Sequence, residues 1–208
     1  MLPLDDPWPS PDRPQVQLVR VPAHALTALA AGDVETAERA VPGPRIDPGL
    51  ALDHCRRVWE IRADQVRERP ADASWVTRLL VDRGPGTGTA PAVATRSGAG
   101  TGRSALVQPG GGTAVGRAGF HGPPDGRGMV EVGYEVVPWA RRRGYARAAM
   151  GALLAVSRAR ADVHVLRATI SPGNGASRAL VASFGLVEVG EQWDEEDGRE
   201  AIFELPVP

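Results

Sequence analysis

Residues 130–147, VEVGYEVVPWARRRGYAR, decide the fold that we expect for this chain. Apolar and polar residues alternate in the first part of this stretch, which predicts a strand over residues 129–137. The chain then turns through Pro138 and three arginines, and Gly144 opens a helix predicted to run to about Ala161. Successive backbone N–H groups at a helix start have no partner inside the helix. The stretch therefore predicts a strand–turn–helix unit whose turn can bind an anion, most naturally a pyrophosphate.

The composition limits how much weight the arginines of this turn can carry. All 24 basic residues are arginine and none is lysine, a bias that indicates a GC-rich genome rather than selection for anion binding. A solvated arginine cluster is therefore the alternative interpretation of residues 141–143. With 25 acidic residues the formal net charge is −1, so the overall charge gives no reason to expect nucleic acid or an anionic membrane as a partner.

The first half of the chain is predicted to be rich in helices. Residues 1–14 are proline-rich and aperiodic, and we expect them to form a disordered arm. Residues 15–208 are expected to form a single domain that begins with a strand at 16–21. Further expected elements are a helix at 24–31, a helix capped by Asp33 that runs to Val41, an amphipathic helix at 50–69 and a strand at 75–82.

Residues 83–112 are predicted to be a flexible insertion. They contain nine glycines and no acidic residue, with few bulky apolar groups to support an ordered structure. The run at 84–88, GPGTG, looks like a phosphate-binding loop, but the G-K-S/T ending and the following helix are both missing. We therefore interpret this segment as a linker.

The remaining elements predict a layered α/β domain on a mixed sheet. Strands are expected at 113–120 and at 163–170, the latter apolar on both faces as in a central strand. Asn174 is expected to cap a helix that ends at Ser183. Residues 186–193 and 199–205 are expected to form a terminal hairpin.

Three groups of residues resemble motifs of the GNAT superfamily of N-acetyltransferases. The pattern Arg141-x-x-Gly144-x-Ala146 is similar to the family's Q/R-x-x-G-x-G/A acyl-CoA signature and lies, as there, between a strand and a helix. Asn174-x-x-Ser177, with the later FGL at 184–186, resembles the second motif of the family. The GFHGPP run at 119–124 and the Gly-Tyr pair at 133–134 resemble the subgroup of ribosomal-protein N-terminal (alanine/serine) acetyltransferases.

The resemblance implies a GNAT-type fold: a mixed, mostly antiparallel sheet with flanking helices, in which strands 129–137 and 163–170 splay apart. The pantetheine arm of acetyl-CoA would pair with one of these strands, the turn amides would hold the pyrophosphate, and the next helix would add polar contacts. The cofactor-binding residues implied in this way are Val136, Val137, Arg141, Arg142, Arg143, Gly144, Tyr145, Ala146, Arg147, Asn174 and Ser177.

The resemblance also implies direct attack of an amine on the thioester, without an acyl-enzyme. Cys55 is then not needed as a nucleophile, and its helical position predicts a core residue. Glu131 is the expected general base, with Glu135 as the alternative, because both lie on the strand beside the expected gap. Regular alternation would place both on one face, although a bulge, common in the family, would change this. The tyrosine that serves some relatives as general acid is replaced by Val181.

Other residues give weaker indications. His121 lies in a Gly-Pro turn, and we expect it to be remote from the gap. The single cysteine and four scattered histidines have no zinc-binding spacing, so no metal is expected. No apolar stretch approaches the roughly 18 to 20 residues of a membrane span, and the N-terminal sequence does not resemble a secretory signal.

We therefore expect a cytoplasmic enzyme that transfers an acetyl group from acetyl-CoA to a primary amine. The acceptor is either a protein N-terminus or a small molecule, and a homodimer is one assembly that we consider. The alternative is a catalytically silent acyl-CoA-binding regulatory module.

Overall fold

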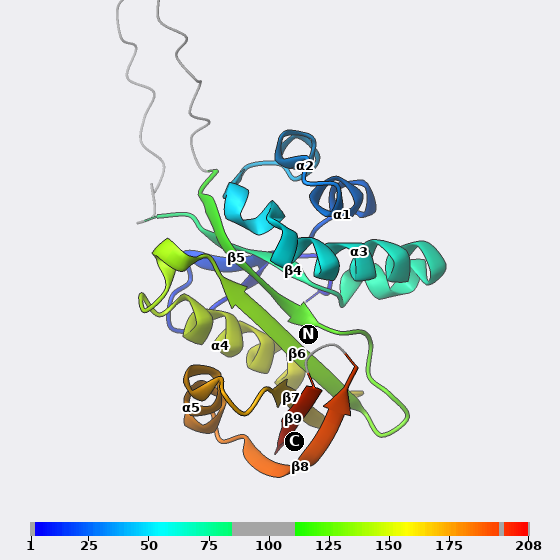
Figure 1. The fold of residues 1–208 in the computed structure, drawn as a ribbon, viewed down its shortest axis with the longest axis vertical. Helices are drawn as coiled ribbons and strands as arrows, with labels where there is room; N and C mark the ends of the chain where they lie inside the picture. Colours follow the sequence, from blue (N-terminus) through cyan, green and yellow to red (C-terminus); the bar gives the residue numbers. More distant parts are fainter. Residues whose placement is uncertain (1–2, 85–110, 196–197, 208) are drawn as a thin grey trace, which may run out of the picture.

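A mixed sheet organises the computed structural model, which describes residues 3–84, 111–195 and 198–207. Strands β5 (Thr113–Phe120) and β6 (Met129–Val136) lie side by side near its centre (Figure 1). Within the described residues the strand order is β1-β2-β4-β5-β6-β7-β9-β8, and β3 pairs with β5 off this path. The other strands are β1 (Trp8–Pro9), β2 (Val16–Val19), β3 (Arg45–Ile46), β4 (Arg78–Asp82), β7 (Val165–Ile170), β8 (Val187–Asp194) and β9 (Gly198–Pro206).

Helices cover both faces of this sheet. In Figure 1 the first three helices gather on one side of β5 and β6, while the last two lie on the other side. The first group is α1 (Ala23–Ala30), α2 (Val34–Ala40) and α3 (Asp53–Glu68), and the second is α4 (Tyr145–Arg158) and α5 (Gly175–Ser183). Short 3-10 turns are η1 (Pro48–Ala51), η2 (Pro70–Ser74) and η3 (Pro138–Ala140). The mixed α/β architecture with a mostly antiparallel sheet confirms the predicted fold class.

Local capping chemistry places several helix boundaries where the sequence predicts them. The Asp33 carboxylate accepts a hydrogen bond from the N–H of Thr36, and the Asn174 side chain accepts one from the N–H of Ser177. The helix expected at 50–69 begins later, at Asp53, because the preceding residues form η1. The strand expected at 75–82 likewise begins only at Arg78.

Strands β6 and β7 pair over only part of their length. They are parallel and in register from Met129 with Val165 to Glu131 with Arg167, and no later pair forms in this described part of the chain. Beyond that point β6 stays paired with β5, and β7 stays paired with β9 as far as Ile170. Each strand is therefore supported on its outer side while its inner edge is left open. This is the splayed strand pair that the family resemblance implies.

The N-terminal segment differs from the expected disordered arm. Residues 3–14 are described, and β1 pairs with β2 through Trp8 and Leu18. Trp8 is fully buried, and its ring centroid lies 5.6 Å from that of Phe120. Arg78 stacks over the indole at 3.5 Å and donates a hydrogen bond to the carbonyl of Asp6. The apolar indole and this buried cation hold the segment against the sheet, which its proline-rich composition does not indicate.

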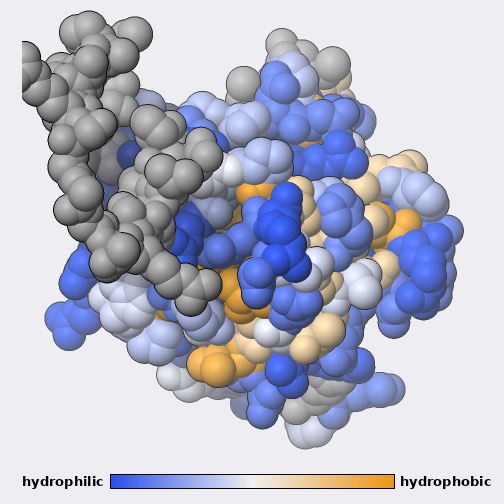
Figure 2. Space-filling model, turned by 90° about the horizontal axis from the view of Figure 1, so that it is seen from above, coloured by the Kyte–Doolittle hydropathy of each residue, from blue (hydrophilic) through white to orange (hydrophobic). Residues whose placement is uncertain are grey.

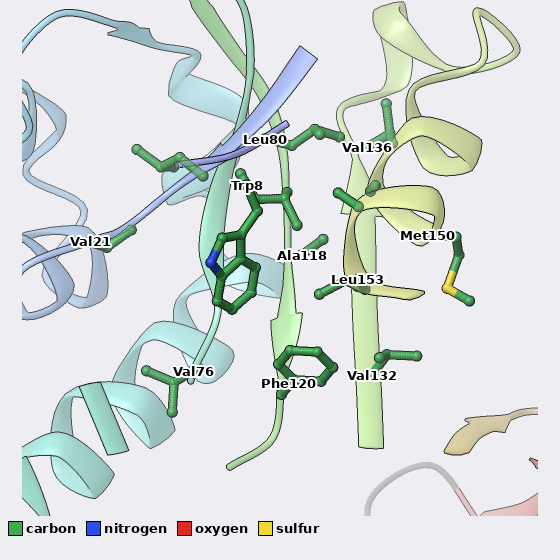
Figure 3. Close-up of a cluster of buried hydrophobic side chains, with 14 of the residues drawn as sticks. Trp8, Val21, Val76, Leu80, Ala118, Phe120, Val132, Val136, Met150 and Leu153 are labelled. Carbon is green, nitrogen blue, oxygen red and sulfur yellow. The ribbon is translucent and has the colours of Figure 1, made fainter. Parts of the chain in front are cut away.

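The buried side chains around Trp8 are continuous with the core between the sheet and α4. Figure 3 shows Trp8, Ala118 and Phe120 on the strands near Leu153 of α4, with Val132 and Val136 on the neighbouring strand β6. The face seen from above in Figure 2 is mostly hydrophilic, with hydrophobic residues in small separate patches. In the described ranges no helix is both long enough and apolar enough to cross a membrane.

Most of the predicted insertion lies outside the residues that the structure describes. Of the segment predicted to be flexible, residues 83–112, positions 85–110 lie outside the described residues. The described ends of the segment join β4 to β5, which are antiparallel neighbours in the sheet. The interpretation of the glycine-rich run as a linker stays a prediction.

Trp8→Ala should strongly destabilise the protein. Truncation removes a fully buried indole that contacts Phe120 and Arg78, so we expect the free energy of unfolding to fall by about 3–5 kcal/mol. Urea denaturation measures the change. Trp193→Ala is the matched control, because that side chain is 78% exposed and its loss should change stability by less than about 0.5 kcal/mol. Equal midpoints for the two variants would show that the N-terminal segment is not part of the core.

Candidate functional site

A cleft opens at the splayed strands and continues along the start of α4. Its volume is about 540 Å³ and it lies between β6, the turn before α4, and α5. The arrangement follows from the sheet, because β6 leads through η3 directly into α4 while β7 leads into α5. Its lining residues are Tyr134, Glu135, Val136, Ala140, Arg141, Arg142, Gly144, Tyr145, Ala146, Arg147, Asn174, Ala176, Ser177 and Leu180.

The turn before α4 presents free backbone donors to this cleft. Gly144, the N-cap of the helix, has φ +81°, and Arg142 has φ +60°. The first amide to enter the helical pattern is that of Ala148, which donates to the Gly144 carbonyl. Within the described residues, the N–H groups of residues 142–147 donate to no protein acceptor. These donors, the positive end of the helix dipole and the adjoining guanidinium groups favour an anion here.

Most of the predicted cofactor-binding residues line the cleft, but two do not. Arg143 is directed elsewhere, with its guanidinium 5.8 Å from the ring of Trp139. The Val137 N–H donates to the Val115 carbonyl at 3.0 Å, so this residue faces β5 rather than the gap. Antiparallel alternation then directs the backbone groups of Val136 away from β5. The Val136 carbonyl accepts a hydrogen bond from Arg141 Nε at 2.9 Å, so a guest strand would have to displace that side chain.

The sequence did not predict that the N-terminal segment reaches this turn. Arg13 donates from its guanidinium to the Arg143 carbonyl at 2.8 Å and lies 4.9 Å from the centroid of the Tyr145 ring. The Tyr145 hydroxyl in turn donates to Asp82 at 2.6 Å. No local pattern in the sequence joins positions so far apart. Arg13 therefore helps to fix the turn from outside the motif.

Tyr134 brings an unsatisfied polar group to the same cleft. Its hydroxyl is buried and has no hydrogen-bond partner among the residues that the structure describes. Burial raises the pKa of Tyr134, and the Ser177 hydroxyl, which lies nearby without meeting hydrogen-bond geometry, partly offsets this effect. A buried hydroxyl without a partner is costly unless a ligand supplies one. The cleft thus holds unpaired donors both at the turn and on β6.

Asn174 and Ser177 line the cleft from α5 while they also serve the helix itself. The Asn174 amide oxygen accepts from the Ser177 N–H at 3.1 Å, which is an N-cap contact. Leu180 also lines the cleft, whereas Val181, at the position where some relatives have a tyrosine, is fully buried. Among the described residues of α5, none supplies a phenol to this site.

Both candidate bases lie on the face of β6 that α3 covers. The β5–β6 register runs without a shift from Phe120 with Val132 to Gly116 with Val136, so regular alternation holds. Glu131 accepts a hydrogen bond at 2.6 Å from the Thr169 hydroxyl of β7, across the opening between the strands. Glu135 is ion-paired with Arg117 at 2.7 Å. Among the residues that the structure describes, Glu131 is therefore the carboxylate at the gap without a guanidinium partner at this distance.

His121 lies beside Glu131, contrary to the expectation that it is remote from the gap. The distance from its Nδ1 to the Glu131 carboxylate is 3.6 Å. The backbone N–H of His121 donates to the Glu131 carbonyl at 2.8 Å, which brings the turn back over β6. A Gly-Pro turn after a strand gives no sign in the sequence that its side chain folds back in this way.

His54, Cys55 and Glu135 also come together, although no zinc spacing is present in the sequence. Their candidate ligand atoms lie within 4.8 Å of one another. Arg117 already pairs with the carboxylate at 2.7 Å. Burial, and then Glu135, raise the pKa of the Cys55 thiol to about 11. A cation would have to displace the guanidinium and deprotonate this thiol, so the donor set fits a resident metal poorly.

The comparisons with known proteins agree with this geometry. The family model described as an acetyltransferase (GNAT) domain matches residues 47–187, which is more than half of the chain. No curated protein sequence matches the chain.

Solved structures show the same fold at low sequence identity. A spermidine N-acetyltransferase chimera from Vibrio cholerae and hSSAT is 12% identical, with 92% of this chain and 95% of that chain covered and a TM-score of 0.57. A ribosomal-protein-S5-alanine acetyltransferase from Vibrio fischeri is 14% identical, with 92% and 93% covered and a TM-score of 0.56. RimJ from Mycobacterium smegmatis, in complex with CoA-disulfide, is 17% identical, with 92% and 81% covered and a TM-score of 0.52.

Glu135→Gln should make Cys55 more reactive toward iodoacetamide. With a pKa of about 11, roughly one thousandth of the thiol is ionised at pH 8. Removing the carboxylate charge leaves Arg117 facing the sulfur, so the pKa should fall. The thiolate fraction should then rise about tenfold for each pKa unit, and alkylation should accelerate by a smaller factor because a thiolate of lower pKa is less nucleophilic.

The rate is measured by mass spectrometry at pH 8, together with the free energy of unfolding to exclude reaction through unfolded protein. Glu60→Gln is the matched control, since this exposed residue lies on the same helix. An unchanged rate in Glu135→Gln would mean that the carboxylate does not influence the thiol.

Proposed function

Because the chain belongs to the GNAT acetyltransferase family, we propose that it transfers the acetyl group of acetyl-CoA to a primary amine by direct attack in a ternary complex. The observation that carries the proposal is the set of backbone N–H groups at 142–147 that have no protein acceptor within the described residues. They line a cleft that leads to the opening between β6 and β7. Such a turn suits a diphosphate at one end and a strand-like chain beyond it.

The residues of the cleft fit the chemical groups of coenzyme A. The amides of residues 142–147 would hold the diphosphate, and the open edge of β6 around Tyr134 and Val136 would pair with the pantetheine amides. The unpartnered Tyr134 hydroxyl is a further donor or acceptor for this ligand. Asn174 and Ser177, which line the cleft from α5, would contact it. When bound, acetyl-CoA supplies an activated acyl carbon and a thiolate leaving group.

The acceptor amine must lose a proton to react, so a base is needed at the gap. An amine with a pKa near 10.4 is about one part in a thousand neutral at pH 7, whereas an α-amine near 7.7–8.0 is roughly a tenth neutral. Glu131, with Glu135 as the alternative, is the carboxylate that promotes removal of this proton, directly or through a neighbouring group. Thr169 fixes Glu131 across the opening, and among the described residues no guanidinium pairs with it at the distance seen for Glu135. Solvent can protonate the departing thiolate, since α5 brings no tyrosine here.

The acceptor is either a protein N-terminus or a small-molecule amine. Both classes appear in the names of similar structures, one a spermidine N-acetyltransferase and another a ribosomal-protein alanine acetyltransferase. The GFHGPP run at 119–124 favours the protein N-terminus.

The remaining expectations belong to the same proposal. The single buried cysteine and the net charge of −1 support a cytoplasmic enzyme without nucleic acid or membrane partners. A homodimer is the assembly to be examined.

Gly144→Val should weaken binding of coenzyme A at least about tenfold. The backbone φ of +81° disfavours any β-branched residue, and the new side chain would stand at the amides that hold the diphosphate. Isothermal titration calorimetry with coenzyme A measures the effect. Gly126→Val is the control, because a Cβ at Gly126 would meet nothing within 4 Å and its φ is not positive. Unchanged affinity in Gly144→Val would remove the turn as the diphosphate site.

Release of coenzyme A on addition of an amine tests the reaction itself. The wild-type protein is incubated with acetyl-CoA and, separately, an alanine-initiated peptide, a serine-initiated peptide and spermidine, and free thiol is measured. We expect acceptor-dependent thiol release with at least one of these amines. Calorimetric binding of acetyl-CoA without release on any of them would instead favour the silent acyl-CoA-binding module.

A further inference from the structure

Hydrogen bonds to its backbone fix His121, the residue that directly follows β5. His121 donates its N–H to the Glu131 carbonyl at 2.8 Å. Its carbonyl accepts hydrogen bonds from two side chains of α3, Arg62 at 3.1 Å and Gln65 at 2.9 Å. Both donors are themselves buried. The turn that carries His121 is thus fixed between α3 and β6.

The imidazole ring lies over β6 where the strands separate. The distance from Nδ1 to the Glu131 carboxylate is 3.6 Å. A Cβ added at Gly133 would stand 2.9 Å from Nε2, which is closer than real side chains allow. Gly133 lies two residues after Glu131, and Glu131 is the last residue of β6 that pairs with β7. Nε2 therefore lies at the opened part of the strand pair, in space that depends on a glycine.

Glu131 is suited to support this ring. Thr169 of β7 donates to its Oε1 at 2.6 Å, so the carboxylate is anchored from the far side of the opening. The same oxygen faces Nδ1 of His121. At 3.6 Å the carboxylate lies beyond hydrogen-bond distance of Nδ1, so its effect on the ring is electrostatic: its charge favours a proton on Nδ1 and leaves Nε2 as the acceptor.

Burial of the ring is the main reason that its neutral form is favoured, although the side chain remains partly accessible. The charged groups that face it are Arg62 of α3, Arg117 of β5 and Glu131 of β6. Packing of the ring lowers the pKa of His121, Arg62 adds to this effect, and Glu131 opposes it. An imidazole with a pKa below 6.5 is mostly unprotonated at pH 7. The side chain is still 45% exposed, so an acceptor can approach it.

We propose that His121 is a catalytic residue of the acetyl transfer, an inference that rests on the proposed function. Nε2 takes the N–H proton of the acceptor amine as the amine lone pair forms the new C–N bond. The C–S bond breaks, the thiolate leaves with the bonding pair, and solvent later protonates it. Glu131 acts through His121 as a positioning residue that stabilises the imidazolium.

The neighbouring groups serve this role less well. Glu135 is ion-paired with Arg117 at 2.7 Å, and His54 lies 3.2 Å from that same carboxylate. The carboxylate of Glu135, or His54 beside it, would have to take a proton while the Arg117 guanidinium holds that carboxylate in an ion pair. His121 is the histidine whose carboxylate partner is anchored at the opening itself.

The test compares His121→Ala with the wild type, using acetyl-CoA and whichever amine of the panel above gives the fastest release of coenzyme A. The value of kcat at pH 7 should fall about 100-fold, the lower range of general-base effects, while the Kd for coenzyme A stays within about twofold. Added imidazole should restore turnover in proportion to its neutral form, which a purely structural role would not produce. His24→Ala, on the exposed surface of α1, is the control and should keep wild-type kcat.

A second measurement does not depend on any acceptor. NMR titration of the histidine ring in the wild type should give a pKa below 6.5 for His121, and in Glu131→Gln a pKa lower still, because the stabilising carboxylate is gone. The kcat of Glu131→Gln should fall as well.

Two results would overturn the inference. One is a His121→Ala variant with wild-type kcat beside an impaired Glu131→Gln, which would make Glu131 the direct base. The other is a His121 pKa that does not respond to Glu131→Gln. Failure of the wild type to release coenzyme A with any amine would instead refute the proposed function, and the inferred catalytic role with it, whatever the titration shows.

Discussion

The separation of β6 from β7 after Glu131 is the constraint on which the rest of the site depends. Each strand keeps a partner on its outer side, β5 for one and β9 for the other, so the sheet stays intact while an inner edge remains open. An open edge in the middle of a sheet has unpaired backbone groups that a strand-like guest can satisfy. The same divergence leads one strand into α4 and the other into α5, which then form the walls of the cleft.

Strand β6 divides the site between its two faces. Tyr134 and Val136 line the cleft on the side of α4 and α5, while Glu131 and Glu135 face α3 with His121, Cys55 and Arg117. The cofactor and the acid–base groups therefore approach the opening from opposite sides of one strand. On the face toward α3, the positive charges of Arg62 and Arg117 lie opposite the negative charges of Glu131 and Glu135. Burial and the neighbouring Glu135 also raise the pKa of Cys55, which favours the protonated thiol.

Sequence reasoning succeeded where local rules govern the structure and failed where distant segments meet. Asp33 and Asn174 cap their helices because an N-cap depends on residues within one turn, and the alternation of β6 follows from its own sequence. The contacts of Trp8 with Phe120 and of Arg13 with Arg143 were missed, since each joins residues more than a hundred positions apart. The sequence does not show that the Val137 N–H pairs with β5, because a strand pattern alone does not say which neighbour each amide reaches. His121 was missed because a turn sequence does not show where its side chain folds back.

A crystal structure of the protein with coenzyme A is the most direct test of this account. We expect the diphosphate on the backbone N–H groups of residues 142–147, and the pantetheine arm along the open edge of β6 after displacement of Arg141 from the Val136 carbonyl. A diphosphate bound elsewhere, or turn amides occupied by the protein's own carbonyl groups in the complex, would contradict it.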